Sequence, residues 1–303
     1  MMSMPIEMIT DDSKTLSRAG FRWHERDGVR ALACTLLESE NFANAFSTRA
    51  GGCSPLSPGG ALNLAGFNED DAANIHENRR RFLNLFQGDW RLATCWQVHG
   101  TNVSVIPRDV SATAALDTNK ERCDALTTDA QHILLGVQTA DCVPVLLGDA
   151  RTGACAAVHA GWRGTAGGIL PAALERMRRE YGTRSEDVCA AIGPAALRCC
   201  YEVGPEVVEI FRARFAAADE LLVPTREGHA RIDLQRANRQ QLTDAGVATG
   251  RIHTAPFCTM CRNDLFFSYR REKPLFGRTG RLLAVIGRDE GGGMRDESKH
   301  SSS

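Results

Sequence analysis

Three residues of the metal-ligand type stand where short apolar segments of the chain end. His99 follows the strand-like segment 92–98, Cys142 separates two apolar runs, and His159 directly follows a third. Side chains at the ends of neighbouring strands converge in open α/β sheets, so we expect these three to meet around one point. Two imidazoles and one thiolate suit Zn²⁺, and three protein ligands leave a fourth position for water, as in catalytic zinc sites. Zinc lowers the pKa of such a water to about 7.

A second interpretation uses the same side chains without a metal. Cys142 would be a thiolate nucleophile that His159 or His99 activates and a further polar group orients. Both interpretations require a deprotonated thiol beside an imidazole, so the residue types leave the two open. The long-range spacing also lacks the specificity of a compact motif such as HExxH.

The composition limits the classes of protein to be considered. The 303 residues carry a formal net charge of -1, with 36 Lys+Arg against 37 Asp+Glu, which argues against general nucleic-acid binding but permits small anionic ligands. The 11 Cys form an odd number, so a fully paired disulfide framework is excluded. The N-terminal residues show no apolar leader and no segment is long enough to span a membrane, so we expect no membrane partner and a reduced, cytoplasmic protein.

Strands and helices alternate along the chain without a break in composition or a fixed repeat. This pattern predicts one α/β domain with a mixed, largely buried sheet over residues 31–288, preceded by a loosely ordered arm (1–30) and followed by a disordered tail (289–303). Residues 107–122 are expected to form a long surface loop, and 38–41 a hairpin turn. The expected strands are 31–37, 42–48, 92–98, 102–106, 133–137, 143–147, 154–158, 188–192 and 282–286, and the expected helices 71–86, 164–181, 205–215 and 234–245.

Several longer motifs occur in order along almost the whole chain. Together they closely resemble the bacterial multicopper polyphenol oxidase, or laccase-domain, family, whose members have also been described as purine nucleoside phosphorylases with adenosine deaminase activity and as peptidoglycan editing factors. The resemblance covers roughly residues 41–288, and HAGWRGT with an upstream ADC is its most specific part. The motifs are FSTRAGG (46–52), NLAGF (63–67), ENRRRF (77–82), QVHGTNV (97–103), TADCVPVLLGD (139–149), AAVHAGWRGTAGGI (156–169), AAIGPAALRCCYEVG (190–204), DLQRANRQQL (233–242) and CTMCRNDLFFSYRR (258–271).

The resemblance implies a fold and a ligand set. It implies a three-layer α/β fold, similar to the catalytic domain of a bacterial deamidase toxin that uses Cys and His. It also implies that the metal ligands are His99, Cys142 and His159, the same residues that the strand ends select. One departure is NLAGF in place of the usual Asn-Leu-Gly, which moves the glycine to Gly66 and changes the loop after Asn63.

The histidine inventory weighs against the oxidase label. A laccase-type multicopper enzyme needs a blue copper and a multinuclear cluster rich in His-x-His pairs, and this chain has no such pair. A single His₂Cys site can accept Cu²⁺, which the Irving–Williams order favours over Zn²⁺, so copper binding by itself would not indicate an oxidase. The eight histidines are at positions 24, 76, 99, 132, 159, 229, 253 and 300.

Nucleoside chemistry fits the residue types better. For deamination, Asp141 beside Cys142 is the nearest carboxylate in the sequence and is either an acid/base group or the residue that orients a ligand histidine. Phosphorolysis needs a phosphate site, for which we propose Arg49 and Arg163, the latter at a helix start. The family motifs add Asn63 and Arg270 as substrate-binding candidates. Aromatic residues that could stack on a base are Trp96, Trp162, Phe266, Phe267 and Tyr269.

The remaining cysteine motifs give no clear site. Cys258 and Cys261 form a CxxC pair, but no second CxxC is present to complete a Cys₄ site. Cys199 and Cys200 are adjacent, which disfavours their ligation of one metal. We interpret these residues as buried thiols, with Cys258 near the pocket in the family motif.

The function predicted from the sequence is a zinc-dependent purine nucleoside phosphorylase with adenosine deaminase activity. It would convert adenosine, inosine or methylthioadenosine to the base and ribose 1-phosphate, at a metal-bound water. The alternatives are a peptidoglycan-precursor editing hydrolase, a copper-dependent polyphenol oxidase, a Cys–His nucleophile hydrolase, and a metal-binding protein without turnover, which a closed four-ligand site would favour. The sequence indicates no oligomeric state.

Overall fold

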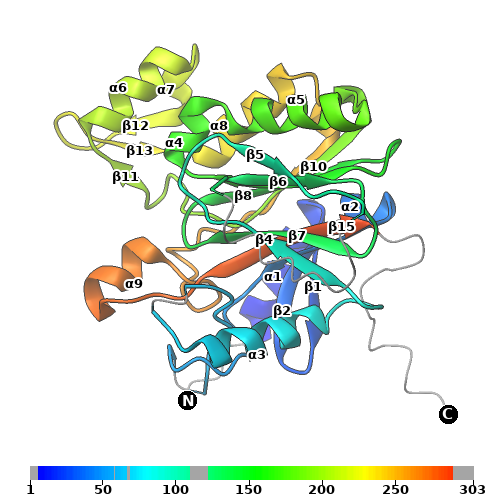
Figure 1. Cartoon of the computed structure of the whole chain (residues 1–303). Helices are drawn as coiled ribbons and strands as arrows, with labels where there is room; N and C mark the ends of the chain where they lie inside the picture. Colours follow the sequence, from blue (N-terminus) through cyan, green and yellow to red (C-terminus); the bar gives the residue numbers. More distant parts are fainter. Residues whose placement is uncertain (1–5, 58, 67–68, 110–121, 289–303) are drawn as a thin grey trace.

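Two six-stranded sheets packed face to face form the centre of the molecule (Figure 1). The computed structural model describes residues 6–57, 59–66, 69–109 and 122–288. The first sheet has the order β1 (Phe21–Arg26), β2 (Val29–Cys34), β3 (Phe42–Ser47), β15 (Leu282–Arg288), β7 (Ile133–Thr139), β4 (Arg91–Thr94). The second has the order β14 (Ile252–Thr254), β10 (Val188–Ile192), β8 (Val143–Asp149), β9 (Cys155–Ala160), β6 (Ala125–Thr128), β5 (Val103–Val105).

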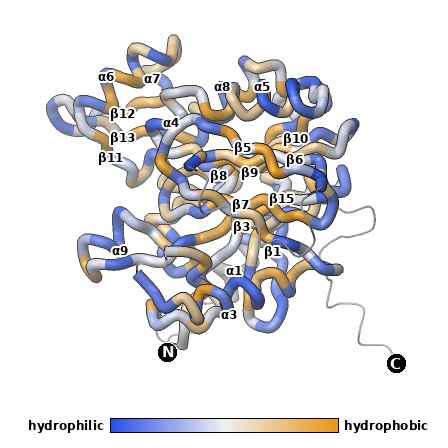
Figure 2. The backbone as a smooth tube through the Cα atoms, viewed as in Figure 1, coloured by the Kyte–Doolittle hydropathy of each residue, from blue (hydrophilic) through white to orange (hydrophobic). Residues whose placement is uncertain are grey.

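Both sheets are mixed and buried on both faces, which explains the continuous apolar runs of their central strands. In β8, Leu146 packs between the sheets, whereas Val145 and Leu147 pack on the opposite face. That opposite face is covered by α4 (Trp162–Gly167), α5 (Ile169–Tyr181) and α8 (Leu234–Asp244). Figure 2 shows hydrophobic residues concentrated along the central strands.

A helix also covers the outer face of the first sheet. Phe82 of α3 (Ala72–Leu83) packs with Leu134 and Leu283, and α3 lies on the side of the molecule opposite α5 in Figure 1. The α/β class with mixed, largely buried strands is therefore confirmed. The expected three layers become four, because the strands divide into two sheets rather than forming one.

The N-terminal segment differs from the expected loose arm. Residues 6–18 form α1 (Ile6–Arg18), and β1 pairs with β2 along its length, which places Leu16 and Phe21 in the core. The weak apolar pattern of the first 30 residues does not predict β1, which is an edge strand of the first sheet. We propose that the chain forms a single domain that includes α1 and β1. The tail 289–303 and most of the expected loop, 110–121, lie outside the described residues.

Two further local expectations are corrected. The expected hairpin turn 38–41 is the end of α2 (Thr35–Ser39) and the turn after it. The single helix expected over 164–181 is divided at Gly168, whose φ of +83° lies in the left-handed region that glycine tolerates.

The remaining elements form a smaller unit at one end and a helix near the site. A three-stranded sheet packs with two short helices at the upper left of Figure 1. Its elements are β11 (Glu202–Val203), β12 (Leu222–Pro224), β13 (Ala230–Ile232), α6 (Pro205–Arg214) and α7 (Ala218–Leu221), and α9 (Tyr269–Phe276) follows later in the chain. Among the described residues, no helix is long and apolar enough to cross a membrane.

Candidate active site

The structure brings His99, Cys142 and His159 together where strands β8 and β9 of the second sheet begin and end. β8 and β9 are antiparallel, and Pro144 of β8 pairs with His159 of β9, so Cys142 at the start of one strand lies beside the end of the other. His99 comes from the loop after β4. Cys142 Sγ lies 3.9 Å from His99 Nε2, and the two imidazole centroids are 4.9 Å apart. The ligand atoms of all three lie within 4.8 Å of one another, as a shared metal requires. We call these residues the triad.

Asp124 is a buried carboxylate that fixes the backbone around His99. Its side chain accepts hydrogen bonds from the amides of Val98, His99 and Gly100, at 3.2, 2.9 and 2.7 Å. His99 has a φ of +60°, a conformation that residues other than glycine seldom adopt. The three amide contacts hold the chain in that turn, so the exposed imidazole of His99 is directed by a residue that lies far from it in the sequence.

The same carboxylate orients His159. Oδ1 of Asp124 lies 2.8 Å from His159 Nδ1, and the His159 amide donates to the Asp124 carbonyl at 2.7 Å. Burial opposes ionisation of Asp124, but the hydrogen bonds from His159 and the backbone outweigh it and lower the pKa of the carboxyl. Because Nδ1 is engaged, Nε2 of His159 is the nitrogen left for the triad. A ligand histidine whose second nitrogen donates to a carboxylate is the usual arrangement at metal centres.

Asp124 was missed in the sequence. It follows the polar stretch 107–122 and precedes β6, which is only four residues long. The available signal was its position directly before the short segment ALTT, as His159 stands at the end of its own strand.

Within the triad, the thiolate of Cys142 and the protonated imidazole of His159 stabilise each other. Burial opposes ionisation of the Cys142 thiol, but His159 and His99 outweigh it and lower its pKa to about 6. Burial likewise opposes protonation of His159, but Cys142 and Asp124 raise its pKa to about 9. A cation is therefore well matched to this site, since it can replace the proton of His159 opposite the thiolate.

Gly161 leaves the space that a bound ion requires. A Cβ at this position would lie 3.0 Å from His99 Cδ2 and 3.1 Å from Cys142 Sγ. Gly161 precedes α4 with a φ of -69°, so its backbone does not need glycine and the small side chain serves the space. Two imidazoles, one thiolate and this opening fit Zn²⁺, and the donor types also accept Cu²⁺.

Asp141 is placed beside the triad but is fully engaged elsewhere. Its carboxylate accepts from Thr259 Oγ1 at 2.6 Å, Ser268 Oγ at 3.0 Å and the Arg270 amide at 2.7 Å. Its φ is +88°, so these contacts stabilise a strained residue next to Cys142. Asp141 therefore positions the Cys142 loop and the start of α9. His159 is oriented by Asp124, not by Asp141.

Two of the predicted substrate-binding residues are held in the interior by other partners. Arg49 forms an ion pair of 2.7 Å with Glu272 and donates to the Asn263 carbonyl at 2.8 Å. Asn63 donates to Asp70 at 2.9 Å and accepts from the Arg281 amide at 2.8 Å.

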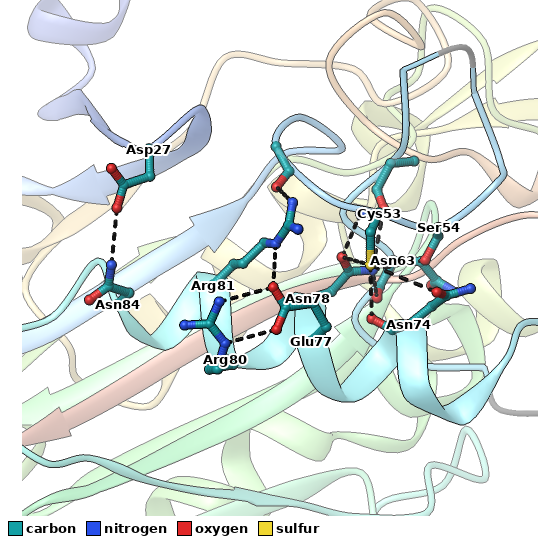
Figure 3. Close-up of polar contacts among 12 residues, drawn as sticks. Asp27, Cys53, Ser54, Asn63, Asn74, Glu77, Asn78, Arg80, Arg81 and Asn84 are labelled. Carbon is teal, nitrogen blue, oxygen red and sulfur yellow. Dashed lines mark hydrogen bonds and ion pairs between the residues drawn. The ribbon is translucent and has the colours of Figure 1, made fainter.

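Asn63 belongs to a polar network that fastens Cys53, Ser54 and Asn63 to α3, shown in Figure 3. Asn78 of α3 donates to the Asn63 carbonyl at 2.9 Å and to Ser54 Oγ at 2.8 Å, and accepts from the Cys53 amide at 2.8 Å. The side-chain groups of Asn63 are thus used inside the protein.

Arg163 and Arg270 are exposed, unlike Arg49. Arg163 lies four residues after His159, and its guanidinium is 4.2 Å from the Trp162 ring centroid. The Arg270 guanidinium is 5.0 Å from the ring of Tyr201.

Of the aromatic candidates, Trp96 and Tyr269 are 56% and 45% exposed, whereas Phe266 and Phe267 are core residues. Trp96 lies three residues before His99 and is exposed, whereas Trp162, three residues after His159, is half-buried, so Trp96 is the better candidate for a stacking surface.

Tyr201 is a second residue that the sequence did not indicate. Its side chain is buried, and burial together with the charge of Cys142 raises the pKa of its hydroxyl. Tyr201 directly follows Cys199 and Cys200 in the sequence and is close enough to Cys142 to be affected by its charge, so the cysteine motif lies near the triad.

Comparison with known proteins identifies the family. Residues 43–289 match the family described as "Multi-copper polyphenol oxidoreductase laccase". The chain belongs to this family. The match spans most of the chain, including the triad, Asp124 and the segments around Cys199 and Cys258.

Two curated relatives of this chain carry the names of enzymes. A purine nucleoside phosphorylase of Bacteroides thetaiotaomicron is 37% identical over 257 residues, which cover 83% of this chain and 93% of that protein. Adenosine deaminase RL5, from an unknown prokaryotic organism, is 38% identical over 256 residues, covering 80% and 96%. The crystal structure of YlmD from Geobacillus stearothermophilus superposes with a TM-score of 0.79 at 34% identity, covering 89% and 99%. The shared fold confirms the α/β architecture.

Proposed function

We propose that this protein is a zinc-dependent purine nucleoside phosphorylase that also deaminates adenosine. The observation that carries the proposal is the three-donor group of His99, Cys142 and His159, with Asp124 fixing the orientation of both histidines. The names of the relatives, a purine nucleoside phosphorylase and an adenosine deaminase, supply the substrate class.

The residues that would hold the metal are Nε2 of His99, Sγ of Cys142 and Nε2 of His159. Zinc, when bound, supplies a Lewis acid and an activated water at neutral pH. The hydrogen bond from His159 to Asp124 occupies Nδ1, so Nε2 is the nitrogen that would give up its proton and serve as a ligand.

The chain's own residues would bind the rest of the substrate. Arg163 and Arg270 are exposed and adjoin the His159 and Asp141 segments, so they are the candidates to bind phosphate by charge-assisted hydrogen bonds. The exposed indole of Trp96 offers a face on which a purine can stack. Arg49, Asn63 and Asp141 support this site through the contacts that hold its loops.

The donor inventory argues against a laccase-type reaction. Within the described part of the chain, the metal-ligand side chains gather in two groups, and only the triad contains histidine. A blue copper and a multinuclear copper cluster require more imidazoles than this site offers. Copper in the triad would be a substitution of the metal rather than evidence of a multicopper centre.

A panel of substrates tests the proposal. Zinc-loaded protein is incubated with adenosine, inosine or methylthioadenosine, with and without phosphate, and with nucleotide-linked peptidoglycan precursors. We expect phosphate-dependent release of base and equimolar ribose 1-phosphate from the nucleosides, and inosine from adenosine without phosphate. Turnover of the cell-wall precursors alone would replace this proposal with the editing hydrolase.

A second function is favoured by one observation. Cys142, His159 and Asp124 are arranged as the nucleophile, base and orienting carboxylate of a cysteine hydrolase, with the thiol pKa lowered to about 6. In that mechanism Cys142→Ala abolishes turnover, but removal of metal with a chelator does not. Activity that disappears on chelation and returns with zinc excludes the second function.

A further inference from the structure

Four cysteines form a second compact group outside the triad. Cys199, Cys200, Cys258 and Cys261 place their sulfurs within 4.8 Å of one another. The distance from Cys261 Sγ is 3.6 Å to Cys199 Sγ and 3.3 Å to Cys200 Sγ. Sulfurs bound to one tetrahedral zinc at about 2.3 Å lie about 3.8 Å apart, so the observed spacing is close to that of a tetrathiolate site. We call these residues the cysteine cluster.

The interpretation of these residues as buried thiols is wrong for the group as a whole. Cys199 and Cys261 are exposed, Cys200 is half-buried, and only Cys258 is buried. All four are free thiols. Four unpaired thiols gathered at a surface form no apolar core, so packing does not explain their arrangement.

A local turn allows the adjacent cysteines to face the same point. The amides of Cys200 and Tyr201 both donate to the Leu197 carbonyl, at 2.9 and 2.8 Å. In such a turn, successive side chains diverge less than in a strand, where they point to opposite faces. The adjacency of Cys199 and Cys200, which argued against shared ligation, is therefore compatible with it.

The CxxC segment has the hydrogen bonds typical of a metal-binding turn. The Leu197 amide donates to Cys258 Sγ at 3.5 Å, and backbone hydrogen bonds from Met260 and Cys261 reach the same sulfur. A bridge between Ala195 and Cys258 brings the two segments side by side. Amides directed at a sulfur stabilise a thiolate, the form that binds metal.

We propose that Cys199, Cys200, Cys258 and Cys261 bind one Zn²⁺ as a closed structural site, separate from the triad. With four protein ligands this site has no open position, so its role is to tie segment 195–201 to segment 258–262. It does not depend on the proposed nucleoside chemistry.

The cluster is connected to the triad by two short contacts. Thr259, between Cys258 and Cys261, donates to Asp141 at 2.6 Å, and the Ala196 amide donates to the Asp141 carbonyl at 2.9 Å. Asp141 precedes Cys142 directly. Zinc in the cluster would therefore stabilise the strained residue that positions Cys142.

Metal content and cobalt spectra of the full chain test the proposal. Elemental analysis of the purified native protein should give two zinc ions per chain, falling to one in the double variant Cys199→Ser/Cys261→Ser and to one in His99→Ala/His159→Ala. Cys53→Ser, which alters a half-buried thiol outside both groups, should keep two.

The variant His99→Ala/His159→Ala leaves the cluster intact and keeps the test decisive if the cluster variant does not fold. Loaded with Co²⁺, it should show the intense thiolate-to-cobalt absorption and tetrahedral bands of four sulfur ligands. The proposal is overturned if this variant binds no stoichiometric cobalt. It is equally overturned if its cluster thiols react fully with a thiol reagent when metal is present, or if mass spectrometry finds the native cluster as a disulfide.

Discussion

His159 Nδ1 and Asp124 Oδ1 lie 2.8 Å apart, and this hydrogen bond determines which nitrogen of His159 faces Cys142. The other oxygen of the same carboxylate accepts from the Gly100 amide at 2.7 Å, beside His99. One buried residue therefore sets the geometry of two histidines of the triad from separate segments.

Replacement of Asp124 by Asn tests whether this carboxylate orients His99 and His159. An amide cannot accept from His159 and from three backbone N–H groups at once, so the tautomer of His159 and the turn at His99 are both disturbed. We expect zinc affinity at the triad to fall by about 10–100-fold, measured by competition with a chromogenic chelator. Asp149→Asn is the matched control, because Asp149 is also buried and accepts backbone amides, but in the turn at the opposite end of β8 from Cys142. Equal affinities of the native protein and Asp124→Asn would contradict the assignment.

Gly161→Ala tests the space between the ligands. The added methyl group would meet His99 and Cys142 at about 3 Å, while the backbone angles of Gly161 suit alanine. Overpacking of this kind costs about 1–3 kcal/mol, and relief of the contact would displace the exposed imidazole of His99, so we expect roughly ten- to hundredfold weaker zinc binding. Gly250→Ala is the control, since nothing lies within 4 Å of its Cβ position. Unchanged zinc binding in Gly161→Ala would show that the ion sits elsewhere.

Asp141→Asn separates positioning from acid/base catalysis. Asp141 accepts three hydrogen bonds, so we expect the variant to lose about 1–3 kcal/mol of stability on thermal or urea unfolding. Its kcat should fall because Cys142 is less well held, but the shape of the pH–rate profile should remain. Loss of one limb of that profile, with stability unchanged, would instead identify Asp141 as the acid/base group.

Arg163→Ala tests the phosphate site. The exposed guanidinium beside Trp162 is free to make a charge-assisted hydrogen bond with an anion, a contact of about 1.5–3 kcal/mol. We expect KM for phosphate to rise roughly ten- to hundredfold, with deamination of adenosine in the absence of phosphate much less affected. Arg178→Ala removes another exposed arginine, which is paired with Glu175 on α5, and should leave both activities unchanged. Equal effects of Arg163→Ala on both reactions would point to a structural role.

The sequence was sufficient for the triad and insufficient for what supports it. His99, Cys142 and His159 were recognisable because each interrupts or ends an apolar run, and the buried strands leave few places for polar side chains. Asp124 was not, because its strand is short and its partners come from a segment far away in the sequence. Of the two roles that the sequence left open for Asp141, the orienting of a histidine falls to Asp124, and only the structure shows Thr259 and Ser268 as partners of the Asp141 carboxylate.

The fold, too, could be predicted only in part from the sequence. The apolar runs of β7, β8 and β9 were predicted close to their observed bounds, because strands buried on both faces have a strong signal. Their separation into two sheets depends on long-range pairing, such as β15 with β3 and β7, which no local pattern encodes. The cysteine cluster was missed for that reason as well, since long-range contacts such as the Ala195–Cys258 bridge bring its two pairs together.

The most direct test of the central claim is the zinc dependence of inosine phosphorolysis. Native protein freed of metal is assayed with phosphate before and after stoichiometric zinc is restored, beside Cys142→Ala treated identically. The account predicts no turnover without metal, recovery of ribose 1-phosphate formation with zinc, and no recovery in Cys142→Ala. Turnover by metal-free native protein, or by Cys142→Ala, would contradict it.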